Sequence, residues 1–109
     1  MSQPAVAHMV YFTLKEGNEQ NRQQLVSACG KYLTDHPGTL FYGTGTRVPD
    51  LAREVNDQEF DVGLHIIFQS RADHDRYQVS ERHQTFIAEN RPNWQRVRVF
   101  DAYVPASAS

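Results

Sequence analysis

The chain has 109 residues and carries 11 basic and 13 acidic side chains, which give a formal net charge of −2. This length suits one domain with a small core. The balanced charge argues against a nucleic-acid surface and a polybasic membrane patch, because both need a basic excess. No apolar stretch approaches the length of a membrane span. Cys29 is the single cysteine, which excludes an intramolecular disulfide and favours a reducing, cytoplasmic location.

The first half of the chain predicts a strand, a helix and a second strand. Residues 6–14 alternate side chains between two faces, and their β-branched and aromatic content is typical of a strand. Apolar residues then recur at helical spacing over 19–35, with Asn18 as the expected N-cap. The His-Pro-Gly sequence at 36–38 ends this helix, and a second strand is predicted at 40–48.

The second half predicts a third strand, a broken helical region and a last strand. Residues 61–69 alternate apolar positions again, and Ser70 follows as an N-cap. The helical region spans 71–91, and Ser80 is placed to interrupt it and cap a second segment. A fourth strand is predicted at 95–104. The order β-α-β-β-α-β indicates an α+β domain with a four-stranded antiparallel sheet and helices on one face.

The predicted sheet has apolar side chains on both faces. The face toward the helices forms the core, to which we assign Val6, Val10, Phe12, Val62, Leu64, Ile66 and Phe68. The opposite, outer face carries Met9, Tyr11, His65, Ile67 and Phe100. An exposed apolar sheet face usually marks an interface, so we expect a homodimer in which two outer faces pack together.

Three segments resemble the stress-responsive A/B barrel (Dabb) domain family. They are A-H-M-V-Y-F-T-L-K from residue 7, D-V-G-L-H-I-I-F-Q-S with D-R-Y-Q-V-S-E-R-H-Q-T-F-I from residues 61 and 75, and V-R-V-F-D-A-Y from residue 97. The resemblance covers about 6–103, so we place the domain at 5–104, followed by a disordered tail at 105–109. It implies a ferredoxin-like fold whose sheets pair across a dimer into a barrel.

The resemblance also implies candidate catalytic residues. A few relatives are polyketide cyclases in which a tyrosine and a histidine on the second helical region do acid-base work. These fall on Tyr77 and His83 here, and a strand-one histidine falls on His8. Relatives often have His-Pro-x-His ending at the position of His83, where this chain has Ser-Glu-Arg-His at 80–83. His8 on its apolar face has a second interpretation, a core histidine bonded to Asp101 or Tyr103.

These residues predict a pocket between sheet and helices that takes a small hydrophobic or aromatic ligand. We expect Leu25, Cys29 and Leu64 to line it beside Tyr77 and His83. We expect no cofactor and no metal, since the consecutive residues Asp73, His74 and Asp75 point in different directions on a helix.

Three functions remain open on these grounds. The first is a stress-associated binding domain whose activity is unassigned. The second is a cofactor-free enzyme, cyclase-like or monooxygenase-like, with His83 as base and Tyr77 as donor. The third is a purely structural dimer, which a filled interior would indicate.

Overall fold

The computed structural model describes residues 3–105, so the predicted tail lies outside the described residues except for Pro105. The elements follow in the predicted order and are β1 (Ala5–Leu14), α1 (Glu19–Tyr32), β2 (Thr39–Thr46), β3 (Val62–Phe68), α2 (Arg71–Gln78), α3 (Glu81–Asn90), the 3₁₀ turn η1 (Arg91–Asn93) and β4 (Trp94–Val104). The predicted α+β fold class is confirmed.

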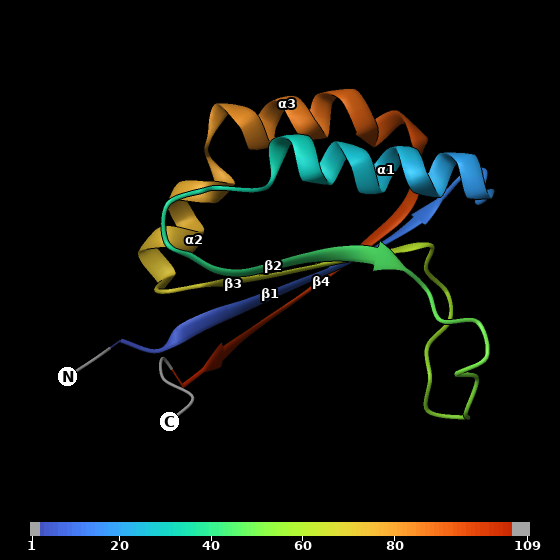
Figure 1. The fold of residues 1–109 in the computed structure, drawn as a ribbon, viewed down its shortest axis with the longest axis horizontal. Helices are drawn as coiled ribbons and strands as arrows, with labels where there is room; N and C mark the ends of the chain where they lie inside the picture. Colours follow the sequence, from blue (N-terminus) through green and yellow to red (C-terminus); the bar gives the residue numbers. More distant parts are fainter. Residues whose placement is uncertain (1–2, 106–109) are drawn as a thin grey trace.

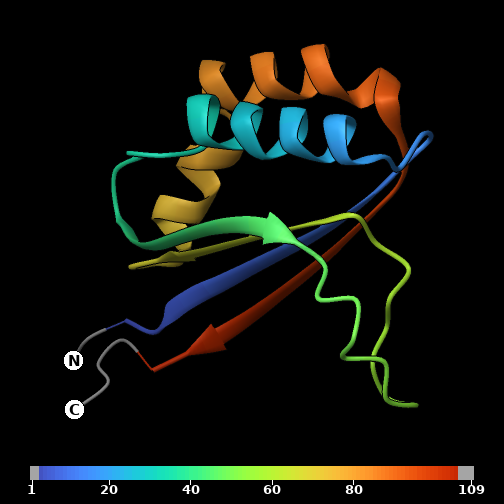
Figure 2. The same cartoon turned by 45° about the vertical axis from the view of Figure 1, so that its right-hand side comes forward.

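The four strands form one antiparallel sheet in the order β2-β3-β1-β4. All helices cover the same face of this sheet, with α1 and α3 side by side above it and α2 closer to the strands (Figures 1 and 2). Strands β1 and β3 therefore lie in the centre, and β2 and β4 form the two edges. None of the helices in residues 3–105 is long and apolar enough to cross a membrane.

Helix α1 begins where the sequence predicts and ends earlier. The Asn18 side chain accepts a hydrogen bond from the Asn21 backbone N–H at 2.8 Å, which satisfies a free donor at the helix start. The prediction that the helix extends to Asp35 is wrong, because its last residue is Tyr32. Asp35 has a φ of 63°, a left-handed conformation that no α-helix continues.

Ser80 divides the second helical region as predicted. Its hydroxyl accepts from the His83 backbone N–H at 3.2 Å and donates to the Tyr77 backbone oxygen at 2.8 Å. One side chain thus caps the start of α3 and satisfies a carbonyl at the end of α2. The break lets the chain change direction between Tyr77 and His83.

The core lies between the sheet and the helices, and the predicted strand register is correct. All seven residues assigned to it are buried: Val6, Val10, Phe12, Val62, Leu64, Ile66 and Phe68. Leu25, Cys29 and Leu33 contribute the buried stripe of α1, and Phe86 contributes that of α3. The apolar residues that alternate along the strands and those that recur at helical spacing along the helices therefore pack in one hydrophobic layer.

The outer face carries an aromatic group centred on Tyr11. Its ring lies 5.0 Å from that of Phe60 and 5.9 Å from that of Phe100, and its hydroxyl is 3.1 Å from His65 Nε2. Phe100 is 54 % exposed in the single chain. The long segment 47–61 hangs away from the sheet on this same side (Figures 1 and 2).

Candidate functional site

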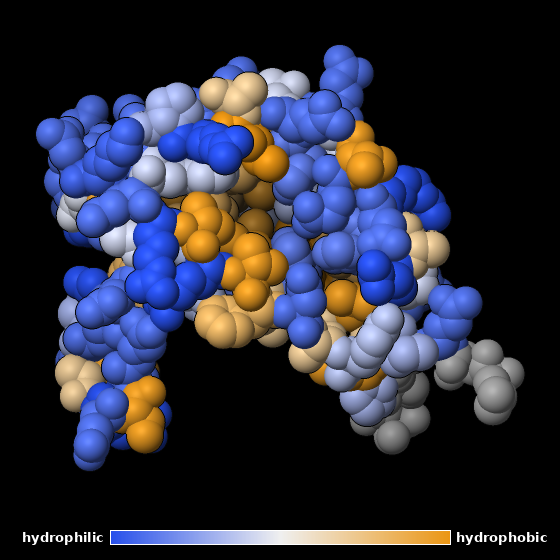
Figure 3. Space-filling view, turned by 180° about the vertical axis from the view of Figure 1, so that it is seen from behind, coloured by the Kyte–Doolittle hydropathy of each residue, from blue (hydrophilic) through white to orange (hydrophobic). Residues whose placement is uncertain are grey.

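A cavity of about 220 Å³ lies between the helices and the β4 side of the sheet. Its lining combines apolar and polar side chains, namely His8, Val10, Phe12, Leu33, Leu64, Tyr77, Gln78, His83, Phe86, Ile87, Trp94, Val97, Val99 and Asp101. Figure 3 shows hydrophobic surface gathered around a hollow below the helices on this side. Since β4 is an edge strand, Val99 at the rim is half exposed and the cavity reaches solvent there.

Tyr77 and His83 both line this cavity, although they come from different helices. Their ring centroids are 4.7 Å apart with an interplanar angle of 63°. Tyr77 is buried against Phe68, whose ring centroid is 4.9 Å away. The turn at Ser80 brings these two side chains together at the cavity.

The imidazole of His83 has a ring nitrogen that lacks a hydrogen-bond partner among the described residues. This nitrogen is Nδ1, and it is buried. Burial, followed by the nearby histidines His8 and His36, lowers the pKa of His83 to about 4. The ring is therefore neutral at pH 7 and offers a lone pair to a ligand.

His8 lines the cavity and is paired across the sheet with Asp101. His8 Nδ1 and Asp101 Oδ1 are 2.5 Å apart, and the two residues are direct partners in the β1–β4 register. Because an ionised carboxylate only accepts, Nδ1 carries the ring proton. Burial lowers the pKa of His8, and the hydrogen bond to Asp101 opposes this shift. Of the two partners considered from sequence, Asp101 is the one the structure shows.

Tyr77 can act only as a hydrogen-bond donor or acceptor in its neutral form. Burial, with smaller contributions from Cys29 and Tyr42, raises the pKa of the phenol well above its usual range. A phenolate would have to form in a region with little solvent. A neutral tyrosine whose ring lies 4.7 Å from a neutral imidazole suits a ligand with a carbonyl or hydroxyl group.

The three predicted lining residues do not lie together. Leu64 lines the cavity with Tyr77 and His83, whereas Leu25 and Cys29 do not. Cys29 is fully buried in the core, where burial raises the pKa of its thiol to about 12. Leu25 lines a separate hollow at the start of α1, and of the buried stripe of α1 only Leu33 reaches the cavity.

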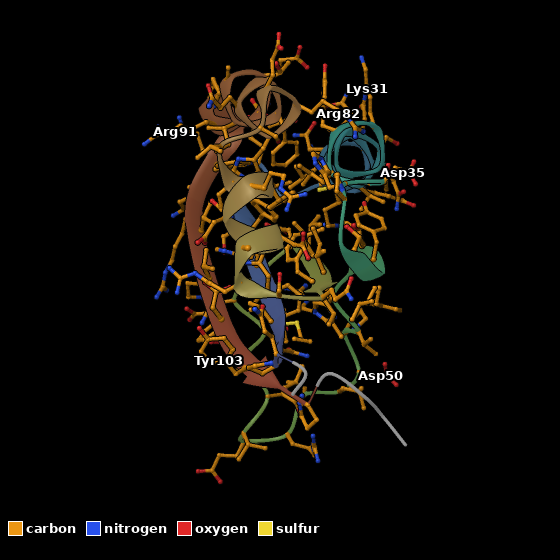
Figure 4. All side chains as sticks on the ribbon, turned by 90° about the vertical axis from the view of Figure 1, so that its left-hand side faces the viewer. Lys31, Asp35, Asp50, Arg82, Arg91 and Tyr103 are labelled. Atoms are coloured by element: carbon orange, nitrogen blue, oxygen red, sulfur yellow. The ribbon has the colours of Figure 1, made fainter. Side chains whose placement is uncertain are left out.

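Arg82, next to His83 in sequence, points away from the cavity. Its guanidinium donates to the backbone oxygens of Thr34 and Lys31 at 2.8 and 2.7 Å. It therefore joins the beginning of α3 to the end of α1, as the neighbouring labels of Arg82 and Lys31 in Figure 4 show. Cations at a helix C-terminus are favourable, which gives Arg82 a structural role.

The sequence did not indicate that β4 supplies one wall of the cavity. Val97 and Val99 pair with Phe12 and Val10 across the sheet, so they share the helix-facing side. Trp94, at the start of β4, packs against Phe12 with ring centroids 4.9 Å apart. The alternation of valines at 97 and 99 was the available signal, but only the strand register shows which face they occupy.

This fold and the matched segments define the class of protein. The family model described as the Stress responsive A/B Barrel Domain (Dabb) matches residues 6–104, and the chain belongs to this family. Comparison with curated proteins finds no match.

Solved structures share the fold at low sequence identity. A Dabb family protein with a ferredoxin-like fold from Mesorhizobium loti has a TM-score of 0.75 at 19 % identity, over 92 % of this chain and 96 % of that chain. A dimeric ferredoxin-like protein of unknown function from Thermobifida fusca has a TM-score of 0.75 at 14 % identity, over 94 % and 92 %. A hydroxynitrile lyase from Passiflora edulis has a TM-score of 0.73 at 21 % identity, over 97 % and 98 %.

Proposed function

We propose that this Dabb domain binds a small, mainly hydrophobic or aromatic molecule that carries a carbonyl or hydroxyl group. The observation that carries the proposal is the convergence of His8, Tyr77 and His83 on one cavity with apolar walls. An apolar pocket that contains a small number of polar groups is typical of a small-molecule site. A second hollow, of about 300 Å³, is lined mainly by polar residues near Lys15 and Asn93 and lacks such a convergence.

The size of the cavity limits the ligand. Engineered apolar cavities of about 150 Å³ bind benzene, so a cavity of about 220 Å³ accommodates one substituted ring. Leu64 and Val99 supply apolar contacts, while His83 and Tyr77, which line the same cavity, offer the ligand polar groups. A ligand that bonds to His83 Nδ1 would satisfy an atom that otherwise has no partner.

Trp94 allows this proposal to be tested by fluorescence. It is the only tryptophan of the chain and lines the cavity. Titration with hydroxyacetophenone, a small aromatic ketone, should change the Trp94 emission in a saturable manner. Val99→Phe, which fills the rim, should weaken this binding at least tenfold.

Gln24→Ala is the matched control, because Gln24 lines the second hollow, which Trp94 also touches. This variant should bind as the wild type does. An emission change that Val99→Phe leaves intact and Gln24→Ala removes would place the ligand in the second hollow and contradict the proposal.

Cofactor-free catalysis in the same cavity is the second candidate. It is supported by the 4.7 Å approach of the Tyr77 and His83 rings, which brings a possible proton donor and a possible proton acceptor to one cavity. An enolisation or aldol-type step needs those two groups. With a pKa of about 4, His83 is a weak base in the empty cavity, and an anionic intermediate beside it would raise that pKa.

The two candidates are separated by turnover. If the protein is an enzyme, His83→Ala should abolish product formation, and Tyr77→Phe should lower kcat while the protein remains folded. Binding without product formation from any aromatic or polyketide-like ketone would leave the binding domain as the function. The hydroxynitrile lyase with the same fold shows only that this fold accommodates an enzyme.

We further propose that two chains associate through their outer sheet faces. Tyr11, Ile67 and Phe100 lie on that face, and segment 47–61 extends on the same side with Leu51 and Val55 exposed. A second copy would cover this apolar surface, and the related protein from Thermobifida fusca is described as dimeric.

The free thiol of Cys29 supports our expectation of a cytoplasmic location.

A further inference from the structure

Three side chains from different elements converge at the β4 edge of the sheet, beside the ligand cavity. They are His8 on β1, His74 on α2 and Asp101 on β4, and one ligand atom from each lies within 4.8 Å of the others. The His8 and His74 ring centroids are 5.1 Å apart. Two imidazoles and a carboxylate form a set that divalent transition metals prefer.

His74 is oriented as a ligand by its neighbours. Its Nδ1 lies 2.9 Å from Asp75 Oδ1, and the same carboxylate oxygen accepts from Arg71 Nε at 2.8 Å. Since the carboxylate accepts, the proton sits on Nδ1 and the lone pair on Nε2. His74 Nε2 is buried and has no hydrogen-bond partner among the described residues. A carboxylate that holds the far nitrogen of a histidine is the usual support of a metal-binding imidazole.

His8 can offer Nδ1 to a metal by moving its ring proton. In the structure Nδ1 donates to Asp101, while His8 Nε2 lies 3.5 Å from the side-chain amide of Gln78. When a metal takes Nδ1 and the Asp101 oxygen, the proton moves to Nε2. The Gln78 amide accepts it there after a rotation that presents its oxygen. The His8 ring remains neutral, so no proton is lost to solvent from it.

The distances require only side-chain adjustment. In tetrahedral zinc sites the ligand atoms lie about 3.3 Å apart, because bonds of about 2.0–2.1 Å meet at the tetrahedral angle. His8 Nδ1 and Asp101 Oδ1 must separate from 2.5 Å, and His74 must move inward from within 4.8 Å. His74 and Asp101 also line a hollow of about 320 Å³ that leads to solvent past Tyr103, near the end of β4 in Figure 4. A water molecule or ligand can therefore complete the coordination from that side.

We propose that His8, His74 and Asp101 form a binding site for one divalent transition-metal ion of the zinc type. This proposal departs from the expectation of no metal: His74 takes part, but with His8 and Asp101 and not with its sequence neighbours Asp73 and Asp75. Asp73 accepts a hydrogen bond from Ser70 and forms an ion pair with Arg76. Asp75 holds His74 Nδ1 and does not bind the ion itself. Two of the ligands, His8 and Asp101, lie on neighbouring strands but 93 residues apart in the sequence, and the third, His74, lies on α2.

Zinc titration of the full chain, prepared without a histidine tag, tests the site by calorimetry. We expect saturation at one Zn²⁺ per chain, and tetrahedral ligand-field absorption when Co²⁺ is used instead. His74→Ala should weaken Zn²⁺ binding more than about 100-fold. Asp75→Asn keeps all three ligands and should weaken it about 10- to 100-fold, as expected for a supporting carboxylate.

Two control variants separate this site from other histidines and from the ligand cavity. His65→Ala removes an imidazole on the outer face, and Tyr77→Phe removes a polar group of the cavity; both should bind Zn²⁺ as the wild type does. Circular dichroism verifies that His74→Ala is folded. The absence of saturable binding, or an affinity that His74→Ala and Asp75→Asn leave unchanged, would overturn the proposal without affecting the ligand cavity.

Discussion

The backbones of Tyr77 and His83 are joined through a single hydroxyl, that of Ser80. This oxygen donates to the Tyr77 carbonyl at 2.8 Å and accepts from the His83 N–H at 3.2 Å. The result is a sharp turn that places the two rings 4.7 Å apart, although six residues of one continuous helix would not bring them together on one face. The site geometry thus depends on a residue that does not line the cavity.

Ser80→Ala should therefore lower both stability and ligand affinity. Loss of an N-cap costs about 1 kcal/mol of the free energy of unfolding, which urea denaturation measures. Ser27→Ala, at an exposed position within α1, is the matched control and should be neutral or slightly stabilising. Equal unfolding free energies for the two variants would show that the Ser80 hydroxyl does not hold the turn.

Leu64→Ala should destabilise the domain by about 2–5 kcal/mol, because it removes buried apolar groups and enlarges the void between the sheet and the helices. Leu64 is buried in the central strand β3 and lines the cavity. Val79→Ala, at a residue that is 70 % exposed on the helix side of the sheet, should change the unfolding free energy by less than about 0.5 kcal/mol. A small effect at Leu64 would mean that the helices do not pack on this strand.

Stability should fall as the pH is lowered from 7 to 4. Burial lowers the pKa of His83 from 6.5 to about 4, so within this range the unfolded chain binds a proton that the folded chain excludes. The contribution of neutral His83 to the free energy of unfolding is therefore complete above pH 6.5 and is lost as the pH falls toward 4. His8, whose pKa is also lowered, contributes in the same direction. His83→Gln should flatten the dependence measured by urea denaturation. Parallel curves for wild type and variant would contradict the burial of His83.

Ile67→Asp should weaken the homodimer, because the new charge would be buried between two outer faces. Light scattering at micromolar concentration should show a dimer for the wild type and a monomer for this variant. Val79→Asp is the control, since Val79 is 70 % exposed at the end of α2, on the helix side of the sheet. A wild-type chain that is monomeric at this concentration would refute the proposed interface.

The fold could be predicted from local patterns because its signals are local. Alternation in β1 and β3 fixed their register, and the caps at Asn18, Ser70 and Ser80 marked three helix starts. The predicted end of helix α1 was too late, because the residue types near Asp35 do not indicate its left-handed conformation.

The candidate site was only partly predictable because its walls come from distant parts of the chain. Tyr77 and His83 lie six residues apart and could be paired through the expected break, and Leu64 followed from its strand face. Leu25 and Cys29 share the buried stripe of α1 with no indication of which end of the sheet they cover. The contribution of β4, and the approach of His74 to His8, depend on tertiary packing that no local pattern contains.

The most direct test of the ligand cavity is an NMR map of where a ligand binds. Amide shifts of labelled protein titrated with hydroxyacetophenone should change at Leu64, Tyr77, His83 and Val99, which surround the cavity on four elements. A new protonation or hydrogen bond at His83 Nδ1 should appear in its ring nitrogen shift. Shifts confined to Lys15, Gln24 and Asn93, or to the outer face around Tyr11, would contradict a ligand site between the helices and β4.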